Sequence, residues 1–141
     1  ATLVVFLVVL GVSAFLYGHL PPGHAATFDP LAVDNIAPFD EPGLVQIDEN
    51  TYQANIVAMA FGYNPSKIEV PKGSEVIFQI TSRDVIHSFT IPHTNVNMMV
   101  IPGYMSMSRH TFEEAGNYLV ICNEYCGTGH HLMHMNIEVI E

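Results

Sequence analysis

Four residues with metal-binding side chains lie close together near the end of the chain: Cys122, Cys126, His130 and Met133. They follow one another at offsets of four, four and three residues, and the two cysteines are the only ones among the 141 residues. Sulfur ligands beside imidazole bind copper in preference to calcium, magnesium or manganese. Residues 122–133 therefore predict a metal site, and copper is the metal that best suits these ligands.

Two other interpretations of the cysteine pair compete with copper. A disulfide is allowed in a chain that lies outside the cytoplasm, but cysteines four residues apart can be bridged only in particular loop geometries. A disulfide would also leave His130 and Met133 without a role. Structural zinc prefers cysteine and histidine ligands in pairs, whereas methionine is a poor zinc ligand and the usual second pair is missing from the sequence.

The number of sulfur ligands indicates how many copper ions the site holds. A single electron-transfer copper takes one Cys, two His and a weak Met ligand, so two cysteines exceed its needs. Two copper ions that share both thiolates would use them, so we expect a binuclear copper site whose second imidazole comes from outside the loop. His87 is the best candidate, although spacing alone leaves open whether it is a ligand or a hydrogen-bonded core residue. His93 and His110 have no potential ligands near them in the sequence.

The elements that must hold these ligands are short β-strands. Seven runs either alternate between apolar and polar residues or are rich in β-branched ones, and turn residues separate them. Strands at this spacing favour an antiparallel sandwich or barrel, in which a rigid sheet fixes both ends of the ligand loop. The predicted strands are residues 52–61, 67–70, 75–81, 87–91, 105–112, 117–122 and 135–140.

The N-terminal segment differs in composition from the rest of the chain. Residues 3–20 contain no Asp, Glu, Lys or Arg, and a helix of this length spans roughly 27 Å, close to the apolar core of a bilayer. A secretory signal peptide is the alternative, but the basic region that precedes the apolar part of such a peptide is absent. We expect a transmembrane helix over residues 1–20, a linker over 21–44 and one β domain over 45–141.

The chain carries a formal net charge of −10, from fourteen acidic residues against four Lys and Arg. Nucleic-acid binding needs a basic surface, so this composition argues against it. An acidic surface instead suits a basic partner that long-range attraction steers towards the site.

With the ligand cluster in view, the chain resembles subunit II of haem-copper cytochrome c oxidases, the family that carries the binuclear copper centre called CuA. The matching motif is C-x-x-x-C-x-x-x-H-x-x-M over residues 122–133, and residues 85–89 resemble the V-x-H-x-F segment of the family. The sequence around Phe61 and His87 is closest to the ba3-type, or B-family, oxidases. The resemblance covers residues 46–141. Further matching segments are residues 60–65, 68–73, 102–103 and 116–118.

The resemblance implies a mainly β, cupredoxin-like Greek-key sandwich that follows one N-terminal transmembrane helix. It implies that the two cysteines of the loop bridge two copper ions and that His87 and His130 are the terminal imidazole ligands. Met133 would be a weak ligand to one copper ion, and the backbone carbonyl of Glu124 would be the weak ligand to the other.

The same resemblance implies the role of a subunit through which electrons enter a respiratory terminal oxidase. The centre would accept one electron from a c-type cytochrome and pass it to a haem in subunit I. Oxygen is reduced to water and protons are pumped in that partner subunit. A single helix would anchor the chain in the lipid of the cytoplasmic membrane, with the copper domain on the periplasmic side.

Three departures from the family have consequences. One membrane span is visible where many relatives have two, which agrees with the resemblance to the ba3 type. The chain has no Trp, the residue through which electrons enter many relatives, so we expect Phe61 or Tyr63 to line that edge. Glu124 stands where the closest relatives carry Gln. In the wider family this carboxylate also binds magnesium at the interface with subunit I, so Glu124 is a candidate magnesium ligand.

Two other functions stay open on the sequence alone. Retention of both cysteines argues against quinol oxidases, which resemble this family but have lost the copper ligands. The CuA subunit of a nitric oxide reductase is not excluded. A copper carrier or assembly protein belongs to a different class, but it needs exposed, exchangeable ligands rather than a closed set that includes Met133.

Overall fold

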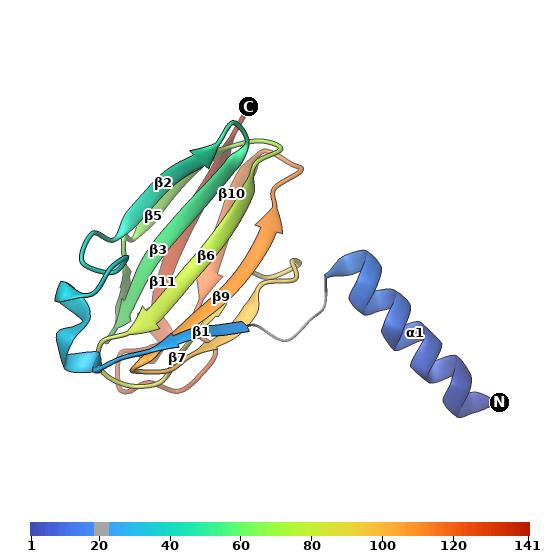
Figure 1. Ribbon diagram of the computed structural model, residues 1–141, viewed down its shortest axis with the longest axis horizontal. Coiled ribbons are helices and arrows are strands. Elements are labelled where there is room, and N and C mark those ends of the chain that lie inside the picture. The colour runs from blue at the N-terminus through green and yellow to red at the C-terminus, as the bar shows by residue number, and fades with distance from the viewer. Residues whose placement is uncertain (19–22) are drawn as a thin grey trace.

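The strands form two sheets that pack face to face in the computed structural model, which describes residues 1–18 and 23–141 (Figure 1). The first sheet has the order β1 (Gly23–Thr27), β9 (Tyr104–Thr111), β6 (Glu75–Ser82), β3 (Thr51–Met59) and β2 (Gly43–Asp48), and β4 (Gly62–Asn64) also pairs with β3. The second sheet has the order β5 (Lys67–Pro71), β11 (His134–Ile140), β10 (Gly116–Ile121), β7 (His87–Thr90) and β8 (Asn97–Val100). The pairs β3–β6 and β5–β11 are parallel.

All seven predicted strands are present, and each observed end lies within two residues of the predicted one. The sequence did not predict β1, β2, β4 and β8. Of these, β1, β4 and β8 are short and contain few β-branched residues. Their pairing with β9, β3 and β7, rather than their own propensity, makes them strands.

The segment expected as a linker, residues 21–44, belongs largely to the sandwich from Gly23 onwards, while residues 21 and 22 lie outside the described part. Its strand β1 pairs with β9, and a 3₁₀-helix, η1 (Pro30–Asn35), follows. Val33 and Phe39 are buried together with Val57 of β3 in a small second core. The segment is more regular than its Pro- and Gly-rich composition suggests, because its few large apolar side chains find partners on the sheet.

The main core lies between the two sheets. Val76, Phe78 and Ile80 of β6 are fully buried, as their alternation in the sequence predicts. The ring of Phe78 packs against that of Phe89 in β7, with the ring centroids 5.2 Å apart. Each side chain of this size contributes about 1.5–3 kcal/mol when it is fully buried. This packing fixes β7, the strand that begins with the predicted ligand His87.

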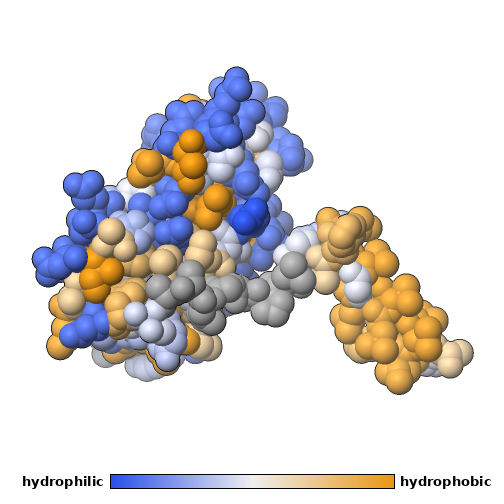
Figure 2. Space-filling model, viewed as in Figure 1, coloured by the Kyte–Doolittle hydropathy of each residue, from blue (hydrophilic) through white to orange (hydrophobic). Residues whose placement is uncertain are grey.

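A helix of 16 residues, α1 (Thr2–Tyr17), precedes the sandwich and ends at Gly18, whose φ of 66° is left-handed. Its residues are almost all apolar and none of them is buried. Apolar residues cover the face of the helix that Figure 2 shows. Within the described residues, the structure contains no helix that is long and apolar enough to cross a membrane. Residues 19 and 20 of the predicted span lie outside the described part, and the transmembrane helix stays a prediction.

Candidate metal centre

The candidate ligands meet at one end of the sandwich, and the chain terminates at the opposite end (Figure 1). His87 is the first residue of β7, and residues 122–133 form the loop between β10 and β11. These two strands pair antiparallel to their ends, and Cys122 N donates to the carbonyl of Met133 at 3.4 Å. The sheet therefore closes the base of the loop and brings its first and last ligands together.

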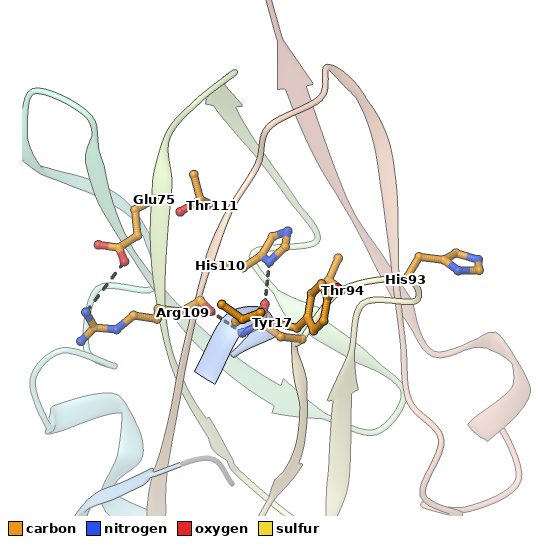
Figure 3. A pocket seen from close by; sticks show the side chains of 9 residues that line it. Tyr17, Glu75, His93, Thr94, Arg109, His110 and Thr111 are labelled. Carbon is orange, nitrogen blue, oxygen red and sulfur yellow. Dashed lines mark hydrogen bonds and ion pairs between the residues drawn. The ribbon is translucent and has the colours of Figure 1, made fainter. Parts of the chain in front are cut away.

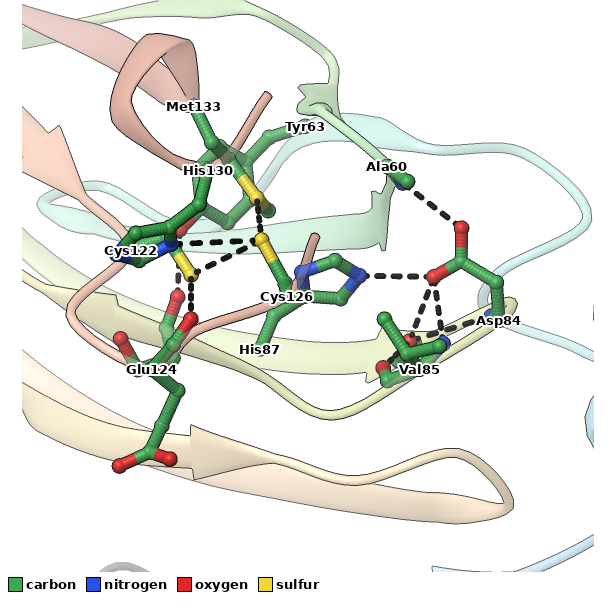
Figure 4. Close-up of polar contacts among 12 residues, drawn as sticks. Ala60, Tyr63, Asp84, Val85, His87, Cys122, Glu124, Cys126, His130 and Met133 are labelled. Carbon is green, nitrogen blue, oxygen red and sulfur yellow. Dashed lines mark hydrogen bonds and ion pairs between the residues drawn. The ribbon is translucent and has the colours of Figure 1, made fainter. Parts of the chain in front are cut away.

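The sulfur atoms of the two cysteines form the centre of the cluster (Figure 4). Cys122 Sγ and Cys126 Sγ lie 3.9 Å apart, and the ligand atoms of His87 and both cysteines lie within 4.8 Å of one another. Cys126 Sγ also lies 3.5 Å from His130 Nδ1 and 3.7 Å from Met133 Sδ. The structure thus gathers all five predicted ligand side chains around the same two sulfur atoms.

The backbone carbonyl of Glu124, the sixth predicted ligand, also faces the cluster. Its oxygen accepts a hydrogen bond from Cys122 Sγ at 3.2 Å. The side chain of Glu124 is exposed, and the residue lines a shallow surface pocket together with Ser88 and Asn97. The carbonyl and the carboxylate of this residue are therefore available to two different partners.

The geometry excludes a disulfide, because bonded sulfur atoms lie about 2.05 Å apart and both cysteines are free. His87 is fully buried, and among the described residues its Nδ1 atom has no hydrogen-bond partner. A buried, unpaired nitrogen costs about 1–3 kcal/mol, and a bond to a metal ion would remove that cost. The donor set of thiols, imidazoles and a thioether fits a soft metal ion such as copper.

Burial favours the protonated thiol of Cys126 in the absence of a metal ion. Cys122 and Cys126 are 7% and 9% exposed. Burial, and then the neighbouring Cys122, raises the pKa of the Cys126 thiol to about 11. Thiolates are the form that binds metal, so an incoming metal ion has to displace a proton from this site.

His87 is held from the outer side of the cluster by Asp84. His87 Nε2 lies 2.8 Å from Asp84 Oδ1, and the carboxylate also accepts hydrogen bonds from Ala60 N at 2.8 Å and Val85 N at 2.7 Å (Figure 4). Partial burial raises the pKa of Asp84, but the hydrogen bonds from His87 and the two amides outweigh it and hold this pKa below its usual value. Asp84 is therefore a carboxylate, and the Nε2 atom of His87 carries the proton.

Ser88, the residue after His87, fastens the ligand loop to β7. Its hydroxyl accepts a hydrogen bond from Asn123 N at 2.6 Å, and its carbonyl accepts one from the Tyr63 hydroxyl at 2.5 Å. Tyr63 is buried, and burial, followed by the nearby cysteines, raises its pKa above the usual range. Of the two aromatic residues predicted to line the edge through which electrons enter, Tyr63 lies inside the domain.

Phe61, the other of these two residues, reaches the surface and is 39% exposed. Its ring packs on the backbone of Gly127 and Gly129 in the ligand loop, so closely that a Cβ atom on Gly127 would lie 2.9 Å from the ring. Gly127 also has a φ of 134°, a conformation that favours glycine. These two glycines allow Phe61 to lie directly on the ligand loop.

Two residues outside the predicted set contact the candidate ligands. Tyr125, between the cysteines, is exposed, and its ring centroid lies 5.8 Å from that of His130. Asp84 stands three residues before His87 and binds its ring. Histidine ligands commonly donate their second N–H to a carboxylate, so an acidic residue close to His87 was the signal that could have identified Asp84.

His93 and His110 lie elsewhere, in a pocket against the end of α1 (Figure 3). Tyr17 and Glu75 also line this pocket, and none of the predicted ligands does. His110 Nδ1 lies 2.6 Å from Asn95 Oδ1, and burial lowers the pKa of His110. These two histidines take no part in the cluster, which agrees with their isolation from other potential ligands in the sequence.

The sequence also matches a family model over most of the domain that carries this site. The model described as cytochrome c oxidase subunit II, periplasmic domain, matches residues 46–140. The chain belongs to this family. The matched region contains all six predicted ligands of the copper site, and the description of the model places such subunit II domains outside the cytoplasm.

Individual members of the subunit II family support the assignment. Cytochrome c oxidase subunit 2 of Thermus thermophilus is 45% identical over 126 residues, which cover 88% of this chain and 93% of the relative. A chain of a heme-copper terminal oxidase dimer solved by cryo-EM superposes with a TM-score of 0.82 at 30% identity, over 99% of this chain and 92% of that chain. The periplasmic domain of subunit II from Bradyrhizobium japonicum superposes with a TM-score of 0.59 at 21% identity, over 69% of this chain and 88% of that domain.

These comparisons confirm the resemblance to subunit II and the mainly β, cupredoxin-like fold. They also confirm the role predicted from the sequence, that of a subunit through which electrons enter a terminal oxidase. Subunit II is a copper-binding subunit, and the His and Cys side chains that meet in this structure are suited to that metal.

Proposed function

We propose that the cluster holds two copper ions bridged by the two cysteines of the loop, with His87 and His130 as terminal ligands. Met133 Sδ and the carbonyl of Glu124 complete the set as weak ligands. When bound, the two ions would take up one electron and release it without any bond being made or broken. The loop, closed at its base by β10 and β11, would keep the ligands in place during this change.

The observation that carries the proposal is that the two cysteine sulfur atoms lie 3.9 Å apart and are buried. A metal–thiolate bond is about 2.3 Å long for zinc. At this separation of the two sulfur atoms, each copper ion could therefore bind both of them, as a bridged pair requires. A single electron-transfer copper needs one thiolate and would leave the second without a role. The burial of Cys122, Cys126 and Met133 also argues against a copper carrier, whose ligands have to be exposed.

For the edge through which electrons enter, we assign Phe61. Its ring is partly exposed and packs on the ligand loop, so a haem edge of a c-type cytochrome that docks at this end would approach it. Tyr63 would support this edge from within, because its hydroxyl holds Ser88, which in turn binds the loop.

The helix α1 would anchor the domain in the membrane. Its apolar side chains cover every face, and none of its residues is buried by the chain itself. A helix of this kind is expected where lipid or apolar helices of a partner cover it. The copper domain would then lie at the periplasmic surface, beside a subunit I whose haem receives the electron.

The carboxylate of Glu124 is proposed as a ligand for magnesium at the interface with subunit I. Its exposure supports this role, because the carbonyl of the same residue faces the cysteines while the side chain stays free for a second partner. Metal analysis of the intact complex tests the proposal. One magnesium ion per complex is expected, and its absence would contradict the assignment.

Purification of the intact membrane complex tests the function as a whole. We expect a haem-copper subunit I to co-purify and the complex to reduce oxygen with electrons from a reduced c-type cytochrome. A complex that reduces nitric oxide but not oxygen would be a nitric oxide reductase instead. A chain that associates with no haem protein and transfers its copper to another protein would be a carrier.

A further inference from the structure

We infer that Asp84 is a positioning residue of the copper centre, which selects the metal-binding tautomer of His87 and strengthens this ligand. The inference rests on the proposed two-copper centre, because it concerns one of its ligands. It assigns a role to a residue that does not contact the metal ions itself.

The two nitrogen atoms of His87 have different surroundings. Nε2 lies 2.8 Å from Asp84 Oδ1, whereas Nδ1 is buried and has no hydrogen-bond partner among the described residues. A carboxylate can only accept hydrogen bonds, so the proton of the neutral ring resides on Nε2 and the lone pair on Nδ1. The ligand atoms of His87, Cys122 and Cys126 lie within 4.8 Å of one another. Asp84 thereby makes Nδ1 the atom that is available to a metal ion.

Asp84 is itself held in place before any metal ion binds. Ala60 N donates to Oδ2 at 2.8 Å, from the turn between β3 and β4, and Val85 N donates to Oδ1 at 2.7 Å. The hydroxyl of Ser82 lies 3.4 Å from Oδ1. These contacts fix the position of the carboxylate, so the ring of His87 meets a preset acceptor and needs little rearrangement to bind a metal ion.

The second imidazole of the cluster is held in a different way. His130 is partly exposed, and its ring packs against the exposed ring of Tyr125. The negative charge of Asp84 makes His87 the stronger electron donor of the two. The carboxylate would thus stabilise the oxidised, more positive state of the centre and lower its reduction potential.

A purely structural role of Asp84 would have different consequences from the proposed positioning role. A buried histidine requires a hydrogen-bond partner in any case, and a structural partner would affect only the stability of the fold. The reduction potential, the copper affinity and the exchange of the Nε2 proton separate the two roles, because each of them depends on the bond between Asp84 and the ligand ring.

The test uses the full chain, loaded with copper in detergent, and three variants. Asp84→Asn keeps the size of the side chain and one acceptor oxygen but removes the charge, and Asp84→Ala removes the acceptor as well. Asp34→Asn is the matched control, because Asp34 is an exposed acid that pairs with Arg83, the residue before Asp84, and has no contact with His87. Far-ultraviolet circular dichroism establishes that each variant is folded.

We expect Asp84→Asn to bind copper about 10–100-fold more weakly in competition with a chelator. Its reduction potential should be higher, and the proton on Nε2 of His87 should exchange faster with D₂O. The control should match the original chain in all three measurements. If folded Asp84→Asn and Asp84→Ala both match the control, the inference is overturned while the two-copper centre stands. If the original chain itself fails to bind two copper ions, the proposed function is overturned first.

Discussion

The sulfur atoms of Cys122 and Cys126 lie 3.9 Å apart, and each has a different weak donor beside it. Cys122 Sγ lies 3.2 Å from the carbonyl oxygen of Glu124, and Cys126 Sγ lies 3.7 Å from Met133 Sδ. The weak ligands are thus divided between the two sulfur atoms. This division suits two metal ions that share both thiolates and differ in their weak ligands.

Replacing either cysteine by serine should abolish the two-copper centre. Serine is similar in size, so Cys122→Ser and Cys126→Ser should fold, but a hydroxyl is a poor substitute for a bridging thiolate. Copper analysis and the optical and EPR spectra of the loaded chain measure the loss. His131→Gln is a suitable control, because His131 is exposed in the same loop and should leave the centre intact. A two-copper spectrum in either serine variant would refute the bridging assignment.

Replacing Met133 by leucine should leave both copper ions in place but shift their reduction potential. Met133 is buried, so a leucine of similar volume should be tolerated at a cost below about 1.5 kcal/mol. Loss of a weak sulfur donor should raise the potential, because the donor stabilises the oxidised state more than the reduced state. A redox titration measures the shift. An unchanged potential would show that Met133 is not a ligand.

The metal-free chain should lose stability as the pH rises above 9. The pKa of Cys126 is raised from 9.0 to about 11, by burial and then by Cys122. The unfolded chain therefore releases this proton near pH 9, whereas the folded chain keeps it until about pH 11. Between these values the unfolded state binds fewer protons, so the free energy of unfolding falls as the pH rises, by at most about 1.4 kcal/mol per pH unit from this group.

Denaturant titrations of the metal-free chain below pH 9 and near pH 11 measure this loss. The contribution of Cys126 is fully present below pH 9 and is lost as the pH approaches 11. Cys126→Ser lacks the thiol, so its stability should fall less over the same range. An equal fall in the original chain and the variant would contradict the prediction.

Replacing Phe61 by alanine should slow the transfer of electrons from a c-type cytochrome to the chain. The ligands do not include Phe61, so the copper content and the EPR spectrum should stay unchanged. Stopped-flow reduction of the copper-loaded chain by the reduced cytochrome measures the rate. Tyr104→Ala is the control, because Tyr104 is an aromatic residue of β9 with a similar exposure, 43% against 39%. Equal rates in the two variants would show that electrons enter elsewhere.

The candidate ligands of the loop could be proposed from the sequence because metal binding requires particular residue types at short spacing. Cys122, Cys126, His130 and Met133 meet in space because one closed loop carries them. His87 could not be assigned as a ligand without the fold, since only the pairing of β7 with β10 brings its strand next to the loop. Spacing left its role open, and its unpaired Nδ1 beside the cysteines now supports the assignment as a ligand.

Other features depend on tertiary contacts that a sequence pattern does not contain. The strand β1 exists because β9 offers it a partner, and its own residues have little preference for strands. Phe61 and Tyr63 could not be separated by residue type, yet one lies on the surface of the ligand loop and the other inside the domain. The role of Asp84 depends on a turn that directs its carboxylate towards His87, and the sequence predicted the strand after that turn but not its geometry.

The copper content and EPR spectrum of the purified full chain test the central claim most directly. We predict two copper ions per chain and, in the oxidised form, a mixed-valence EPR signal in which one unpaired electron is shared equally by both ions. One copper ion per chain, with the signal of an electron confined to a single copper, would contradict the account.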